Sequence, residues 1–148
     1  MLGKRKGIPK GLGEAADPRP ALKRAQTERK QAKDPYGLDE RQAAEKAYLA
    51  ATQAADVVAA KLLGRKPEGT GGRYDALARL DKQKGTQTAQ AFSDVRLNLH
   101  EDCFHEGRCT REGLDEGFAA AKRLVADVRK HVGFTPYPPP KPRGRQRK

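Results

Sequence analysis

Five residues between positions 96 and 109 have side chains able to do chemistry: Arg96, His100, Cys103, His105 and Cys109. Arg96 and His100 are four positions apart, so on a helix they lie on one face. A histidine exchanges protons near neutral pH and an arginine stabilises phosphate charge, so this pair could cleave RNA. The alternative is an exposed arginine and a helix histidine bonded to nearby carboxylates. We expect binding without catalysis and keep Arg96 and His100 as the catalytic candidates.

The same stretch contains the residue types that bind zinc, because His100, Cys103, His105 and Cys109 form a His-x2-Cys-x-His-x3-Cys pattern. The spacing differs from that of paired zinc knuckles, and on a continuous helix His105 points away from Cys103. Cys103 also falls on an apolar stripe, where a buried thiol acts as a small hydrophobic side chain. Two cysteines make no disulfide framework, so we expect reduced thiols. We predict no metal and no cofactor, with these four residues as the candidate ligands.

Two helices joined by a polar turn should position these side chains. The first is predicted to start at Thr86 or Thr88 and to end at Gly107. The second is predicted to start after Thr110 as its N-cap and to end before Gly133. Apolar residues recur along both at steps of three and four, the pattern of a buried helical face. These residues are Ala89, Phe92, Val95, Leu99 and Cys103 in the first helix, and Leu114, Phe118, Ala121, Val125, Val128 and Val132 in the second.

Further helices are predicted on the N-terminal side of this pair. An alanine-rich helix should run from Glu40 to Leu63, and a shorter one from Tyr74 to Lys84, with a glycine-rich loop over residues 65–72 between them. The apolar stripe of the first consists of Ala44, Tyr48, Ala51, Ala55, Val58 and Leu62, and the apolar contacts of the second are Tyr74, Leu77 and Leu80. Residues 21–33 could form another helix with little apolar surface for docking. No segment outside the loops alternates as a strand would. The predicted fold class is therefore all-α, an antiparallel bundle of four to five helices.

Charge divides the chain of 148 residues, whose net charge is +12, into three segments. Residues 1–33 contain ten Lys/Arg against three acidic residues, and residues 134–148 contain five against none. Residues 34–133 contain sixteen of each. We predict a basic arm, disordered or partly helical, over 1–33, a helical domain over 34–133, and a Pro-rich spacer with a disordered basic tail over 134–148. Without a membrane span or secretory signal, a cytoplasmic protein is expected, associated with the nucleoid if it binds DNA.

The C-terminal segment contains the sharpest binding motif. Pro142-Arg143-Gly144-Arg145 resembles the core of an AT-hook, which lies in the narrow minor groove of A·T-rich DNA, although Gln146 replaces the usual second proline. Basic arms on a neutral domain favour a nucleic-acid partner, DNA ahead of RNA, over a role in solubility alone. The expected contact residues are Lys4, Arg5, Lys6, Lys10, Lys23, Arg24, Lys141, Arg143, Gly144, Arg145, Arg147 and Lys148.

The order of features over residues 40–132 resembles the HEPN-like helical domains, and most closely a bacterial branch without an assigned function. The similarity rests on Tyr74-Asp-Ala-Leu-Ala-Arg-Leu, on Phe92 and Leu99-His100, on the His105-Glu106-Gly107 turn, and on Glu116-Gly117-Phe118 with Ala120-Ala121-Lys122. The resemblance implies an antiparallel HEPN-like bundle, often dimeric. Active members are ribonucleases with four to six residues between Arg and His. Arg96 and His100 have three between them, so the signature is absent in its usual spacing.

These observations together predict a small, non-catalytic nucleic-acid-binding protein. The bundle would fold and form a homodimer, and the arms would neutralise phosphates. Two alternatives remain open. One is a ribonuclease or toxin that uses Arg96 and His100. The other is an adaptor that binds a protein partner through its helical surface and Pro-rich segment. No membrane partner is expected.

Overall fold

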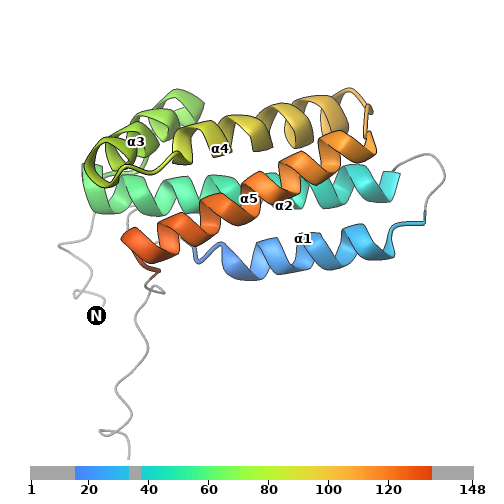
Figure 1. The fold of residues 1–148 in the computed structure, drawn as a ribbon, viewed down its shortest axis with the longest axis horizontal. Helices are drawn as coiled ribbons and strands as arrows, with labels where there is room; N and C mark the ends of the chain where they lie inside the picture. Colours follow the sequence, from blue (N-terminus) through green and yellow to red (C-terminus); the bar gives the residue numbers. More distant parts are fainter. Residues whose placement is uncertain (1–15, 34–37, 135–148) are drawn as a thin grey trace, which may run out of the picture.

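The computed structural model describes residues 16–33 and 38–134, and in these ranges the chain forms helices and no strands. Figure 1 shows the helices packed side by side in one antiparallel bundle. This confirms the predicted all-α bundle of four to five helices. The elements are α1 (Arg19–Gln31), α2 (Leu38–Val58), which continues as the π-helical η2 (Ala59–Leu63), α3 (Gly69–Lys84), α4 (Thr88–Val95), which continues as the π-helical η3 (Arg96–His105), and α5 (Arg111–His131).

The central helix is α2, which contacts α1, α3, α4, α5 and η3. Its buried surface consists almost entirely of small side chains, and small side chains let neighbouring helix axes approach closely. The predicted alanine stripe is therefore confirmed as the middle of the core. The fully buried alanines of this helix are Ala43, Ala44, Ala47, Ala50, Ala51, Ala54 and Ala55.

The apolar stripes predicted for the last two helices also face the core. In α4 and η3, Phe92 and Leu99 are fully buried, and in α5 the predicted residues from Leu114 to Val128 are buried. Val132 and Ala89 are partly buried. Thr110 caps α5 as predicted, because its hydroxyl accepts a hydrogen bond from the Gly113 amide at 2.9 Å.

The helix α1 packs on the bundle, whereas the sequence predicts a basic arm over residues 1–33 with little apolar surface for docking. Leu22 and Ala25 of α1 are buried, and Arg29 forms an ion pair with Asp115 of α5. The Arg29 guanidinium also lies 5.1 Å from the centre of the Phe118 ring. Polar and cation–π contacts thus supplement a short apolar face. Residues 19–31 belong to the helical bundle.

The start of α3 differs from the prediction, because the helix begins at Gly69 and not at Tyr74. The expected loop over residues 65–72 therefore contains its first turn. A Cβ at position 72 would lie 3.3 Å from the backbone of Pro67, so glycine lets this turn pack closely against the preceding residues. Gly72, one of the glycines that predicted a loop, is therefore accommodated in the first turn of a helix.

Within residues 16–33 and 38–134, no helix combines the length and the apolar character needed to cross a membrane.

Candidate functional site

A polar cluster lies where η3 packs against α2, with His100 at its centre. The Nδ1 atom of His100 lies 2.8 Å from an Oε1 of Glu45 on α2, and the imidazole stacks on the Tyr48 ring with a centroid distance of 4.1 Å. The Nε2 atom of His100 lies 3.2 Å from Nε2 of His105. The His100 side chain is 20% exposed. A neutral His100 that donates from Nδ1 to Glu45 therefore presents the lone pair of Nε2 towards His105.

The other catalytic candidate, Arg96, borders this cluster. Its Nε donates a hydrogen bond to the Tyr74 hydroxyl of α3 at 3.2 Å, and a terminal nitrogen lies 3.5 Å from the Glu101 carboxylate. The hydrogen bond with Tyr74 raises the pKa of Arg96. Burial raises the pKa of Tyr48, which also lies within range of the Arg96 charge. Arg96 and His100 thus belong to one polar region, in which Tyr74 and Glu101 hold the guanidinium.

The π-helical geometry of η3 explains how His100 and His105 meet. On an α-helix, residues five apart point about 140° from each other. In a π-helix the backbone hydrogen bond spans five residues, which brings such residues to one side. The Glu106 amide donates to the Glu101 carbonyl at 3.0 Å, which is a bond of this type. The sequence pattern predicts a regular helix here, in which the two histidines would not meet.

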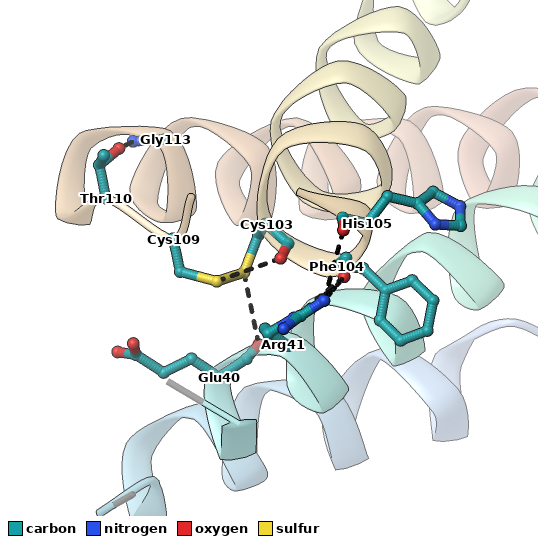
Figure 2. The surroundings of a disulfide bond; sticks show 8 residues. All are labelled: Glu40, Arg41, Cys103, Phe104, His105, Cys109, Thr110 and Gly113. Atoms are coloured by element: carbon teal, nitrogen blue, oxygen red, sulfur yellow. Dashed lines mark hydrogen bonds between the residues drawn. A yellow bond between two sulfur atoms is a disulfide. The ribbon is translucent and has the colours of Figure 1, made fainter. Parts of the chain in front are cut away.

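An arginine of α2 fixes the end of η3. Two nitrogens of Arg41 donate to the Phe104 carbonyl at 3.0 and 2.6 Å, as Figure 2 shows. These bonds satisfy a carbonyl that has no partner inside the helix end. Arg41 therefore helps to hold His105, the next residue, beside His100.

Cys103 and Cys109 are joined by a disulfide, which corrects the expectation of reduced thiols (Figure 2). The left-handed Gly107 (φ +74°) helps the chain to turn back after η3, so that Cys109 reaches the buried Cys103. In Figure 2 the His105 imidazole points away from the disulfide. The four zinc candidates His100, Cys103, His105 and Cys109 therefore do not form one site, because the sulfurs bond to each other and lie apart from His105.

Glu45 is a residue of this site that was not predicted from the sequence. A glutamate on an alanine-rich helix ordinarily faces solvent. The sequence feature that could have indicated Glu45 is its position three residues before Tyr48, which was predicted on the buried stripe of the same helix. Tyr48 and Tyr74 were predicted as apolar contacts, and in the cluster the Tyr48 ring stacks on His100 while the Tyr74 hydroxyl accepts a hydrogen bond from Arg96.

Among the predicted nucleic-acid-binding residues, the structure describes Lys23 and Arg24, both exposed on α1. The remaining ten lie outside the described residues, and they are Lys4, Arg5, Lys6, Lys10, Lys141, Arg143, Gly144, Arg145, Arg147 and Lys148.

A groove of about 430 Å³ runs between α1 and α5 and adds basic side chains to this surface. Lys30 of α1 and Lys122 of α5 line it beside Phe118. Lys23 lies on the same side of α1 as Lys30, because seven residues make two helical turns. Lys30 and Lys122 come from helices far apart in sequence, so no local pattern identified them.

The two ends of the described chain lie close together. Arg19 lies 5.3 Å from the centre of the Phe134 ring. A hydrogen bond from Arg19 lowers the pKa of Asp17, and the charge of Arg129 on α5 adds to this effect. The terminal segments 1–15 and 135–148 therefore join the bundle at neighbouring points.

Comparison with protein families matches residues 21–125 to the archaeal PaREP1/PaREP8 family. No curated protein and no solved structure matches the chain. The family match corrects the resemblance to HEPN-like domains of a bacterial branch. That resemblance rested on features such as Tyr74–Leu80 and Glu116-Gly117-Phe118, which are helical patterns that unrelated bundles share. Because the match extends from α1 to α5 and covers most of the sequence, this chain belongs to the archaeal PaREP1/PaREP8 family.

Proposed function

We propose that the protein binds nucleic acid through its basic terminal segments and the adjoining face of α1 and α5. The observation that carries this proposal is the segregation of charge. Residues 34–133 have equal numbers of acidic and basic residues, so the whole excess of +12 lies in the flanking segments. A nucleic acid is a polyanion, and neutralising its phosphates releases counterions and supplies affinity.

The arrangement of the described residues supports one continuous binding surface. Lys23 and Arg24 are exposed on α1, and Lys30 and Lys122 line the neighbouring groove. The segments on either side of the bundle begin beside each other, as the contact between Arg19 and Phe134 indicates. Both segments can thus reach the same stretch of nucleic acid.

The preferred partner in this proposal is A·T-rich DNA. Arg143-Gly144-Arg145 matches the part of an AT-hook that enters the minor groove, where a narrow A·T tract has the most negative potential. The other basic residues contact phosphates, which give affinity without reading the base sequence.

Neutralising the C-terminal segment in the full-length chain tests the proposal. The test variant changes Lys141, Arg143, Arg145, Arg147 and Lys148 to Gln. Binding to labelled A·T-rich DNA, G·C-rich DNA and RNA is measured by fluorescence anisotropy at fixed salt. We expect the variant to lose roughly tenfold or more in affinity, because phosphate contacts are removed. Its preference for A·T-rich DNA should disappear as well.

A control variant removes the same number of charges elsewhere. It changes the exposed residues Arg65, Lys66, Arg79, Lys82 and Lys84 to Gln, in and just before α3, which lies on the other side of α2 from α1 (Figure 1). The control should bind nearly as tightly as the wild type. Equal losses of affinity in both variants would show that binding depends on net charge alone and not on the C-terminal segment. No binding by the wild type, or RNA shortened during the assay, would contradict the proposal.

A further inference from the structure

The two histidines beside Glu45 form a second candidate site that nucleic-acid binding does not use. We propose that the Nε2 atoms of His100 and His105 bind a divalent transition-metal ion. These atoms are 3.2 Å apart. Two imidazole nitrogens that share a tetrahedral zinc ion, each about 2.0–2.1 Å from it, are separated by roughly this distance. The pair therefore already has the spacing of two ligands of one ion.

Glu45 supplies the outer contact that such a ligand requires. Metal-binding histidines commonly donate their other ring N–H to a carboxylate, which fixes the tautomer and orients the ring. His100 has this partner, because its Nδ1 lies 2.8 Å from Glu45. The Tyr48 ring stacks on the same imidazole and restricts its rotation. The Nε2 atom of His100 is thus prepared as a ligand.

The surroundings leave the ion accessible. His105 is exposed, whereas His100 is partly buried. In the parts of the chain that the structure describes, no cluster of three or more His, Cys, Asp or Glu side chains could hold a metal. Two imidazoles thus leave coordination positions for water or for an anionic ligand, as at open zinc sites. Imidazole ligands favour Zn²⁺, Cu²⁺ and Ni²⁺ over Mg²⁺.

Titration calorimetry with zinc chloride tests this site in the full-length chain without nucleic acid, so its result is independent of the proposed function. The disulfide is kept oxidised, because free thiolates would bind zinc themselves. We expect one Zn²⁺ per chain in the wild type and none in His105→Ala. Glu45→Gln should weaken binding by about tenfold or more, because it removes the outer carboxylate. His131→Ala is the matched control and should bind as the wild type does.

Thermal unfolding gives a second readout. An ion that binds only the folded chain raises its unfolding temperature. Zinc should therefore stabilise the wild type and His131→Ala and leave His105→Ala unchanged. His105 is exposed, so its removal should preserve the helical circular dichroism spectrum. The proposal would be overturned by zinc binding that persists in His105→Ala, by equal binding of Mg²⁺, or by no zinc binding in the wild type. The two histidines would then form only a hydrogen-bonded pair.

Discussion

Asp81 fixes the start of α4 from the end of α3. One of its oxygens accepts hydrogen bonds from the Thr88 amide at 2.7 Å and from the Thr86 hydroxyl at 2.6 Å. The other accepts from the Ala89 amide at 3.0 Å. Two amides that the first turn of a helix leaves without partners are thereby satisfied. A single carboxylate thus joins two helices.

Replacing Asp81 with Ala should cost about 1–2 kcal/mol in the free energy of unfolding, because a helix cap is lost. Burial raises the pKa of Asp81, but hydrogen bonds from Thr86, Thr88 and the Ala89 amide outweigh burial and lower it from 3.8. A lowered pKa favours the charged carboxylate in the folded state. Its contribution is complete at neutral pH and is lost as pH falls below the unfolded value of 3.8 through the lower folded one.

Urea unfolding at neutral and at acidic pH measures this effect. Asp75→Ala is the control, because Asp75 is an exposed carboxylate on the same helix. The control should change the unfolding free energy by no more than about 0.5 kcal/mol. Equal costs for the two variants, or a cost of Asp81→Ala that does not shrink in acid, would refute the capping role.

For single residues, the sequence predicted contacts between residues close in the chain and did not predict contacts between distant segments. Thr110 was identified as an N-cap because the capped amide lies three residues away. For α4 the prediction was Thr86 or Thr88, but the cap comes from Asp81, seven residues before Thr88. His100 was a candidate from its residue type and its spacing of four from Arg96. Its partner Glu45 lies 55 residues away, which no local spacing reveals.

Between elements, Gly117 sets how closely α5 approaches η3. A Cβ at this position would lie 2.5 Å from two carbons of the fully buried Leu99. Gly117→Ala should therefore cost about 1–3 kcal/mol through overpacking, despite the better helix propensity of alanine. Gly71→Ala in α3 is the control, because its Cβ meets no heavy atom within 4 Å. It should leave stability unchanged or raise it by up to about 1 kcal/mol.

A double-mutant cycle separates this contact from a general effect of the substitution. Leu99→Ala alone should cost about 2–5 kcal/mol. Combined with Gly117→Ala, the cost should be lower than the sum by at least about 0.5 kcal/mol, because the smaller side chain makes room for the new methyl group. Chemical denaturation provides all four values. If the two costs simply add, the destabilisation by Gly117→Ala does not arise from a clash with Leu99.

The disulfide ties the end of η3 to the residues before α5. Its two cysteines are six positions apart, so it closes a short loop. Cys109→Ala should lower the free energy of unfolding by about 2 kcal/mol, because the unfolded chain gains freedom. Adding a reductant should destabilise the wild type to a similar extent and leave the variant unaffected. Equal stability of the oxidised wild type and the variant would contradict this account.

Helices were predicted well because their signal is local and periodic. The stripes of α2, α4 and α5 appear in the sequence and are buried in the structure. The π-helical character of η3 was not predicted, since nothing in the apolar spacing distinguishes it from a regular helix. That difference decides whether His100 and His105 point to the same side of the helix. The pairing of the two histidines could therefore not be predicted from the sequence.

For the whole molecule, charge segregation was readable from the sequence because it requires no knowledge of the fold. The docking of α1 could not be predicted from the sequence, because its ion pairs join Glu28 to Lys46 and Arg29 to the still more distant Asp115. Removal of residues 1–33 would therefore delete a packed helix together with the basic segment. The homodimer expected from the sequence stays a prediction.

The salt dependence of binding tests the central claim most directly. The slope of log K against log salt concentration should be steeply negative for the full-length chain on A·T-rich DNA, by about 0.9 for each phosphate contact. The variant with Gln at Lys141, Arg143, Arg145, Arg147 and Lys148 should have a shallower slope, by up to about 4.5 for five lost contacts. The control variant around α3 should keep the wild-type slope. A flat wild-type slope, or the same slope in the C-terminal variant, would contradict nucleic-acid binding through the basic segments.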